Sequence, residues 1–435
     1  MNLETALERL FHRNLHVVKL DLEPMQALMS RLGNPQDQFI CLHVAGTNGK
    51  GSVSAMLASI LREQGYRTAL YTSPHLVRFN ERIQVDGVSI NDESLKALID
   101  EIEQAAATLV SGGMRDVTFF EFTTALAFLY FMRSGVQIAV IETGMGGRLD
   151  ATNIITPALS IITSIGFEHT AYLGTTLQEI AGEKAGIIKS GRPVIMGALP
   201  ETAAYVIGER ANRLKAPFRV ASELVSVAIK SISLEGQTLD ITGQNAAYGK
   251  VKSPLPGYHQ AQNAAVVIAA AECLNNEIGI PVSEKAIKDG ISKTYWPARG
   301  QLLQKDPPVI LDGAHNVEAA GVLARWVGKV AGKKPLGMIV GFLSDKDPEA
   351  FIRCFGNRVH AIWVSPIQSD RAMPTEESVR RLARLSRPVC MAELDAAIVA
   401  AREWAVREHG MVLITGSLYL AGETLALQDK LHWLK

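Results

Sequence analysis

The feature that most constrains the fold is a buried strand followed by a glycine-rich loop and then a helix. Residues 39–45 (FICLHVA) are mostly apolar, residues 46–51 contain three glycines, and residues 52–64 have helical spacing that ends before Gly65. Glycine permits backbone conformations that bring successive N–H groups close to a phosphate, and the positive end of the following helix attracts the anion. This order of elements predicts a phosphate-binding loop in an α/β fold.

Lys50 lies in this loop, from which a lysine reaches the β- and γ-phosphates of a nucleotide. The loop departs from the usual pattern because Val44 replaces a glycine and Gly51 separates Lys50 from Ser52. A flexible turn that opens a helix is the alternative interpretation, but the flanking strand and helix favour phosphate binding. The predicted contacts are Thr47, Asn48, Gly49, Lys50, Gly51 and Ser52.

Strands and helices alternate along most of the chain, which predicts βαβ units and a mostly parallel sheet. Residues 218–251 instead have short alternating runs between turn residues, which predicts a hairpin or meander. The αβ pattern restarts after YWPARG (residues 295–300). We therefore predict an α/β protein with a P-loop-type, mostly parallel N-terminal domain (residues 1–296) that carries a small antiparallel addition. A smaller Rossmann-like α/β domain (residues 297–435) follows it.

The charge balance excludes several classes of protein. Lys plus Arg and Asp plus Glu both number 44 among 435 residues, so no global positive field exists for nucleic acid or an anionic membrane. No apolar run approaches the ~20 residues of a membrane-spanning helix, and the charged N-terminus is unlike a signal peptide. The four cysteines lie far apart, without metal-type or disulfide spacing. We expect a cytoplasmic monomer that acts on small molecules.

Glu142 stands at the carboxyl end of a predicted strand, ahead of the glycine-rich segment TGMGGRLDATN. Ligands of open α/β sheets lie beyond the carboxyl ends of the strands. A carboxylate beside a phosphate loop suits Mg²⁺, which takes one or two protein carboxylates and leaves its other positions to water and phosphate. A helix-capping or solvent-facing glutamate is the alternative, and the polar segment that follows favours the metal.

His169 and Lys184 follow the next predicted strand. A lone histidine is more often structural, but at a strand end His169 can bind a second metal through a neutral nitrogen. Lys184 can pair with Glu183, contact a phosphate, or lose its proton when it is desolvated near metals. The residues alone leave these alternatives open.

Polar residues follow other predicted strands as well. The loop at residues 72–82 (TSPHLVRFNER) can close over a substrate or serve as an ordinary surface loop. Asp312 and Ser417 each end a strand and open a helix, so helix N-capping is an alternative to ligand binding. Asp312 can accept ribose hydroxyls, Asn263 can hold an adenine edge, and Arg299 near the hinge can meet the γ-phosphate.

Five motifs, in this order and spacing, resemble the folate-handling branch of the Mur ligase superfamily. They are HVAGTNGKGS, TSPHLVRFNERI, IETGMGGRLDATN, HTAYLGTTLQEIAGEKAGI and LDGAHN. The branch comprises folylpolyglutamate synthase and the bifunctional dihydrofolate synthase/folylpolyglutamate synthase. The resemblance implies an ATP-dependent ligase that joins a folate-type carboxylate to the amino group of L-glutamate through an acyl phosphate.

The resemblance also implies roles for individual residues, with Lys50, His169 and Lys184 as the catalytic set. It places one Mg²⁺ on Ser73 and Glu142. It places a second Mg²⁺ on His169, with Lys184 as a carbamate. The implied nucleotide contacts are Asn263, Arg299 and Asp312, and the implied glutamate contacts are His315 and Ser417. The implied pterin contacts are Val18, Lys19, Leu20, Thr118, Leu149, Asp150 and Ala151.

One segment departs from the family pattern, because VKLDLEPM has Asp21 and Pro24 where a glycine and an arginine are usual. This departure bears on the pterin site more than on the ATP site. Within the ligase class we favour the bifunctional enzyme over one that only extends folate chains. A nucleotide switch and a UDP-muramyl-peptide ligase are further alternatives. The second is disfavoured because a loop that begins at residue 46 leaves no room for a sugar-nucleotide domain.

Overall fold

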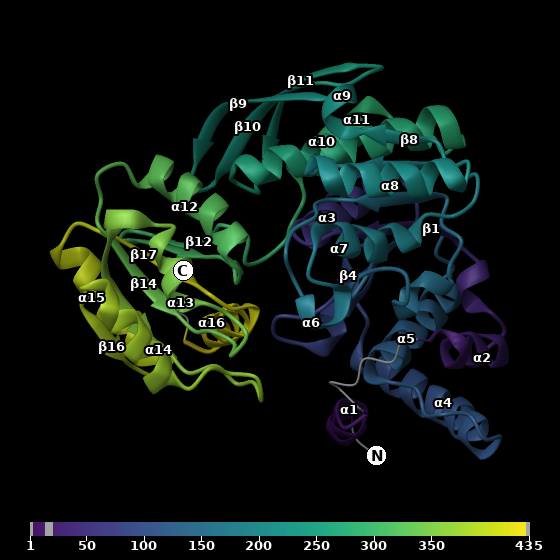
Figure 1. Cartoon of the computed structure of the whole chain (residues 1–435), viewed down its shortest axis with the longest axis horizontal. Coiled ribbons are helices and arrows are strands. Elements are labelled where there is room, and N and C mark those ends of the chain that lie inside the picture. The colour runs from purple at the N-terminus through teal and green to yellow at the C-terminus, as the bar shows by residue number, and fades with distance from the viewer. Residues whose placement is uncertain (1–2, 14–20, 432–435) are drawn as a thin grey trace.

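An eight-stranded sheet forms the centre of the N-terminal domain in the computed structural model, which describes residues 3–13 and 21–431 (Figure 1). The strand order is β4-β3-β2-β5-β1-β6-β7-β8, in which the β2–β3 and β3–β4 pairings are antiparallel and the others are parallel. Strand β5 is buried along its whole length, as expected for a strand covered on both faces. The strands are Ile40–Ala45 (β1), Thr68–Tyr71 (β2), Ile83–Val85 (β3), Val88–Ser89 (β4), Ile138–Glu142 (β5), Leu159–Ile162 (β6), Val194–Met196 (β7) and Phe218–Val220 (β8).

Helices cover both faces of this sheet. Because alternate residues of a strand point to opposite faces, Ile138 and Val140 pack with α3, α10 and α11, whereas Ala139 and Ile141 pack with α1, α2, α4 and α5. The helices of this domain are Leu3–Phe11 (α1), Glu23–Arg31 (α2), Lys50–Glu63 (α3), Asp92–Ser111 (α4), Phe119–Arg133 (α5), Thr170–Leu173 (α6), Leu177–Lys184 (α7), Glu201–Arg213 (α8), Ala221–Leu224 (α9), Tyr258–Cys273 (α10) and Glu284–Ser292 (α11).

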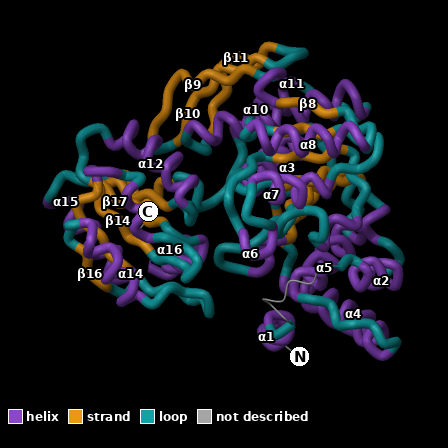
Figure 2. The backbone as a smooth tube through the Cα atoms, viewed as in Figure 1, coloured by secondary structure: helices purple, strands orange, loops and turns teal. Residues whose placement is uncertain are grey.

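A separate three-stranded antiparallel sheet lies beside the main one and reaches toward the C-terminal domain (Figure 2). Its strands are Ser226–Ser233 (β9), Gly236–Thr242 (β10) and Ala247–Ser253 (β11), in the order β11-β10-β9. The side chains of Ile232 and Leu234 pack against the core of the C-terminal domain. The meander predicted for residues 218–251 is therefore confirmed in its later part. The predicted start of the meander at residue 218 was wrong, because Phe218–Val220 (β8) pairs in parallel with β7 in the main sheet and is followed by α9.

The C-terminal domain is built on a six-stranded sheet of order β12-β13-β17-β14-β15-β16, parallel except for the β12–β13 pair. The two domains together confirm the predicted α/β fold. Within the described ranges, no helix is both long enough and apolar enough to cross a bilayer. The strands are Gln301–Lys305 (β12), Pro308–Leu311 (β13), Leu336–Val340 (β14), Val359–Val364 (β15), Val389–Met391 (β16) and Met411–Thr415 (β17), and the helices are Val317–Ala331 (α12), Pro348–Arg353 (α13), Thr375–Leu382 (α14), Leu394–Arg407 (α15) and Leu418–Leu431 (α16).

Candidate active site

The predicted phosphate loop at residues 46–51 runs from the end of β1 into α3. Gly46 and Gly49 have φ angles of +154° and +86°. A Cβ atom at Gly46 would overlap the Thr163 hydroxyl, and a Cβ atom at Gly49 would lie 2.7 Å from Asn263 Oδ1. Both positions therefore require glycine, and the close packing of β6 and α10 fixes the course of the loop.

Hydrogen bonds tie this loop to the segment that follows β6. Thr163 Oγ1 and Ser164 Oγ donate to the Asn48 carbonyl at 2.7 and 2.9 Å. Thr47 Oγ1 donates to the Gly166 carbonyl at 3.1 Å and accepts from the Gly166 N–H at 3.0 Å. The phosphate loop and the segment after β6 are thus held as one unit.

Two lysine ammonium groups converge on the carbonyl of Gly46. Lys50 Nζ donates to it at 2.9 Å and to the Thr47 carbonyl at 3.2 Å, and Lys184 Nζ donates to it at 2.8 Å. Lys184 is only 2% exposed. Burial and the charge of Lys50 lower the pKa of Lys184 to about 7, although Glu168 acts in the opposite direction. The site therefore concentrates positive charge where a phosphate would lie and holds one amine that is readily neutral.

Glu142 is at the carboxyl end of β5, next to the end of β1, and is 4% exposed. Burial raises the pKa of Glu142 to about 7, while Lys50, Arg299 and the backbone of Ser73 act to lower it. Its Oε2 atom accepts no hydrogen bond from any residue of the described ranges. A buried carboxylate oxygen without a donor is a suitable ligand for a hard cation.

These residues fit Mg²⁺ in a site completed by the substrate. Within residues 3–13 and 21–431, no three His, Cys, Asp or Glu side chains are grouped to hold a metal by themselves. Mg²⁺ does not require such a group, because it usually keeps waters and phosphate oxygens beside one or two carboxylates. Glu142 and the neighbouring Ser73 match that chemistry.

Glu168, which was not predicted, lies between two histidines that were. Its Oε1 atom is 3.9 Å from His169 Nε2 and 3.6 Å from His315 Nε2. Burial acts to raise the pKa of Glu168, but His315 and Lys50 outweigh it and hold this pKa below its ordinary value. Burial lowers the pKa of His169, which keeps its ring in the neutral form that binds metals. The only sequence signal for Glu168 was its position directly before His169.

The predicted nucleotide contacts come from both domains. Asn263 Nδ2 donates to Gln260 Oε1 at 3.0 Å, and Gln260 Nε2 donates to Ser52 Oγ at 3.2 Å, so α10 is fixed against the start of α3. Burial raises the pKa values of Glu142 and Asp312, and the positive charge of Arg299, at the hinge, acts to lower both.

Both carboxylate oxygens of Asp312 accept hydrogen bonds from nearby backbone N–H groups. Its Oδ2 accepts from the Gly300 N–H at 2.7 Å, and its Oδ1 accepts from the Ala314 N–H at 2.8 Å. These bonds anchor the hinge to the start of the C-terminal domain. Each carboxylate oxygen retains capacity to accept a further hydrogen bond.

Several predicted substrate contacts make local capping bonds. The Thr118 hydroxyl accepts from the Glu121 N–H at the start of α5, and Ser417 Oγ accepts from the Tyr419 N–H at 3.0 Å. The carboxylate of Asp150 accepts from the Thr152 hydroxyl and the Met145 N–H. Leu149 is partly buried and Ala151 is buried beside Asp150. Val18, Lys19 and Leu20 lie outside the described residues.

An aromatic group beside the loop at residues 72–82 was also not predicted. Phe11 stacks on Phe119 with ring centroids 5.5 Å apart, and Phe79 meets Phe119 edge-on at 6.2 Å. The buried guanidinium of Arg82 lies 5.3 Å from the Phe119 ring centroid and donates to His75 Nδ1 at 2.8 Å. The loop is thereby packed against α1 and α5, which single motifs could not show.

Comparisons with known proteins agree with this geometry. Residues 44–271 match the Mur ligase middle domain, and residues 299–427 match the dihydrofolate synthetase C-terminal domain. The chain is 37% identical over 407 residues to the dihydrofolate synthase/folylpolyglutamate synthase of Bacillus subtilis, covering 93% of this chain and 94% of that one.

Solved structures give the same result. The Mycobacterium tuberculosis folylpolyglutamate synthase complexed with ADP and AMPPCP superposes with a TM-score of 0.91 at 31% identity, covering 98% of both chains. An FPGS–AMPPCP–folate complex superposes with a TM-score of 0.87 at 32% identity, covering 99% of this chain and 100% of that one.

The fold and the site define an ATP-dependent ligase, as predicted. The chain belongs to the Mur ligase family, in the branch of dihydrofolate synthases and folylpolyglutamate synthases that its motifs resemble.

Proposed function

We propose that the chain is bifunctional and adds L-glutamate first to dihydropteroate and then to folates. The observation that carries the ligase step is the convergence of Lys50 and Lys184 on the Gly46 carbonyl, with the buried Glu142 at the end of the adjacent strand. Such a group of charges is suited to moving a phosphoryl group from ATP to a carboxylate. The names of the Bacillus subtilis relative and of the folate complex support the substrates.

The reaction begins with an acid that is inert toward amines. A carboxylate oxygen of the acid attacks the γ-phosphorus of ATP. The bond between that phosphorus and the oxygen that bridges to the β-phosphate breaks, ADP departs, and an acyl phosphate remains. The neutral amine of glutamate then attacks the carbonyl carbon, a C–N bond forms, phosphate departs with the electron pair of the C–O bond, and the nitrogen releases one proton to water. Lys50 offsets charge on the transferring group, and Arg299 is placed to do so from the hinge.

Two Mg²⁺ ions fit this arrangement. Ser73 and Glu142 would hold one, and His169 would hold the other together with Lys184 as a carbamate. Bound Mg²⁺ neutralises phosphate charge and orients the γ-phosphoryl group. Glu168, whose Oε1 lies 3.9 and 3.6 Å from the two rings, would help to orient His169 and His315.

The environment of Lys184 supports the proposed carbamate. A buried amine with a pKa of about 7 is substantially neutral at physiological pH. Its nitrogen adds to CO₂, a C–N bond forms, and one proton is released to water. The product is an anionic oxygen ligand in place of a second cation beside Lys50.

The remaining assignments are proposals of the same kind. Asn263, Arg299 and Asp312 bind the nucleotide, and His315 and Ser417 bind the incoming glutamate. Thr118 and residues 149–151 contact the pterin. Residues 1–296 and 297–435 are the two domains of a monomeric cytoplasmic enzyme.

An acceptor comparison tests the bifunctional assignment. The purified chain is incubated with ATP, Mg²⁺ and glutamate, together with either dihydropteroate or tetrahydrofolate, and the products are identified by mass spectrometry. We expect a product one glutamyl residue heavier from both acceptors. Product from tetrahydrofolate but not from dihydropteroate would instead indicate an enzyme that only extends folate chains.

A further inference from the structure

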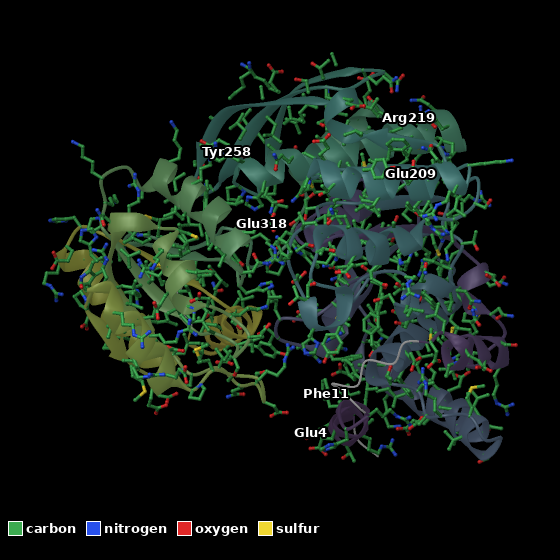
Figure 3. All side chains as sticks on the ribbon, viewed as in Figure 1. Glu4, Phe11, Glu209, Arg219, Tyr258 and Glu318 are labelled. Atoms are coloured by element: carbon green, nitrogen blue, oxygen red, sulfur yellow. The ribbon has the colours of Figure 1, made fainter. Side chains whose placement is uncertain are left out.

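We propose that one side of helix α12, formed by Glu318 and Arg325, is a coupling surface that holds the C-terminal domain over the phosphate loop. The two residues are seven positions apart and therefore lie on the same side of the helix. In Figure 3, Glu318 lies where the two domains face each other. The inference rests on the ligase function and assigns these residues a positioning role in it.

Glu318 contacts both segments of the N-terminal domain that build the phosphate site. Asn48 Nδ2 of the phosphate loop donates to Glu318 Oε2 at 3.0 Å. A Cβ atom at Gly166, after β6, would overlap the same oxygen, so the carboxylate uses space that only glycine leaves. Asn316 Nδ2 adds a second bond across the boundary, to Asn48 Oδ1 at 3.3 Å. One loop residue therefore bonds the start of α12 twice.

Arg325 makes the second contact, two helical turns further along α12. Its guanidinium carbon lies 4.9 Å from the centroid of the Tyr258 ring, at the start of α10. Helix α10 also carries Gln260 and Asn263, which pack on the start of α3 and on the phosphate loop. Both contacts of α12 thus end on elements that surround the predicted nucleotide site.

An interaction with the helix dipole alone does not explain where the Glu318 carboxylate lies. A glutamate in the first turn of a helix interacts favourably with the helix dipole wherever its carboxylate points. The carboxylate of Glu318 instead reaches across the domain boundary, beside the ionised Glu168. Its Oε2 atom accepts from Asn48 Nδ2 and occupies the space left by the missing side chain of Gly166. The position of this carboxylate is therefore determined by contacts with the other domain.

The functional consequence concerns the acyl phosphate. When the domains separate, water attacks its carbonyl carbon, the C–O bond to phosphate breaks, and the free acid is regenerated with loss of ATP. When α12 is seated, His315, the proposed glutamate contact just before its start, faces the phosphate loop and water is excluded. The coupling surface therefore determines how many ATP molecules are used for each amide formed.

Glu318→Ala and Arg325→Ala test the proposal, with Glu376→Ala and Arg380→Ala on α14 as matched controls. Glu376 and Arg380 are exposed residues of a C-terminal helix, and Glu376 is also in its first turn. ADP and glutamylated product are measured in the same reaction. We expect each α12 variant to lower kcat/KM for glutamate by about threefold to tenfold, the loss of one hydrogen bond or cation–π contact. ADP should exceed product, with little change in KM for ATP.

Conservative variants separate positioning from a structural role. Glu318→Gln keeps an oxygen that accepts from Asn48, and Arg325→Lys keeps a cation over the Tyr258 ring, so both should restore coupling. Glu318→Asp keeps the helix-terminal charge but shortens the side chain, so it should remain uncoupled. Equal amounts of ADP and product in Glu318→Ala, Glu318→Asp and Arg325→Ala would overturn the proposal.

Small-angle scattering of the ADP-bound proteins gives a readout that does not depend on turnover. The α12 variants should have a larger radius of gyration than the wild type and the α14 controls. An unchanged radius would contradict the coupling surface even if the enzyme proved to use other substrates. Failure of the wild type to glutamylate any acceptor would instead contradict the proposed function.

Discussion

His43 should make the N-terminal domain sensitive to acid, because it is buried in its neutral form. The residue is on β1 and is 0% exposed. Its Nε2 lies 2.8 Å from Thr152 Oγ1, whose hydroxyl donates to Asp150 Oδ1 at 2.5 Å. The Thr152 oxygen therefore accepts from His43 Nε2–H. Its Nδ1 atom is buried without a partner in the described residues, so a second proton would have no acceptor.

The magnitude follows from the pKa. Burial, with a smaller effect of Lys189, lowers the pKa of His43 from 6.5 to about 3. Because the folded-state pKa lies below the unfolded value, the unfolded chain binds a proton between these pH values that the folded protein does not. Stability is complete above pH 6.5 and falls as the pH decreases toward 3. At pH 4.5, two units below the unfolded value, the loss is about 3 kcal/mol.

Replacement of His43 by glutamine provides the assay. The amide of Gln can donate to Thr152 in place of Nε2–H but does not titrate. The free energy of unfolding is measured by urea denaturation for both proteins at pH 7.5 and pH 4.5. We expect the wild type to lose about 3 kcal/mol more than His43→Gln between the two pH values. Equal losses would refute the argument that His43 stays neutral in the folded protein.

Three further outcomes test the site and the core of the N-terminal domain. Activity should fall in CO₂-depleted buffer and return when bicarbonate is added. The recovery should be more complete at pH 8 than at pH 6, because the Lys184 amine is mostly neutral at pH 8. Activity that does not respond to bicarbonate would exclude the carbamate. Gly49→Ala should lower the affinity for ADP about tenfold or more in calorimetry, because the added Cβ would lie against Asn263 of α10. Gly65→Ala is the control: Gly65 also has a positive φ, but a Cβ there meets no neighbouring atom, so the affinity should be unchanged. Tyr248→Phe should lower the free energy of unfolding by about 1–3 kcal/mol without changing kcat. The substitution removes the hydroxyl that donates to the buried carboxylate of Glu272 at 2.9 Å. An unchanged urea midpoint would show that this bond contributes little to stability.

The sequence was most informative where local chemistry determines local structure. The glycines of the phosphate loop require conformations and close contacts that other residues cannot accept, so the strand–loop–helix unit was predictable. Glu142 was found for a similar reason, because a buried strand that ends in a carboxylate indicates a site at the sheet edge. Element boundaries were less certain: the helical spacing seen over residues 52–64 corresponds to α3, which begins two residues earlier and spans Lys50–Glu63.

The sequence was least informative where residues meet across the two domains. Glu168 and His315 are far apart in the chain, and their proximity depends on how the domains pack. Glu318 has the sequence context of an ordinary helix-terminal acid, and nothing local indicates that it bonds Asn48. Within the N-terminal domain, Phe11 and Phe119 are also far apart in the chain and meet because α1 packs beside α5. These contacts depend on tertiary arrangement and not on motif spacing.

Transfer of a carboxylate oxygen to phosphate tests the central claim most directly. Dihydropteroate labelled with ¹⁸O in its carboxylate is incubated with the purified chain, ATP, Mg²⁺ and glutamate, and the released phosphate is analysed by mass spectrometry. If the acid is phosphorylated beside Lys50 and Glu142, each amide formed should yield one phosphate that carries one ¹⁸O atom. Amide formation with unlabelled phosphate would show that ATP activates something other than the acid.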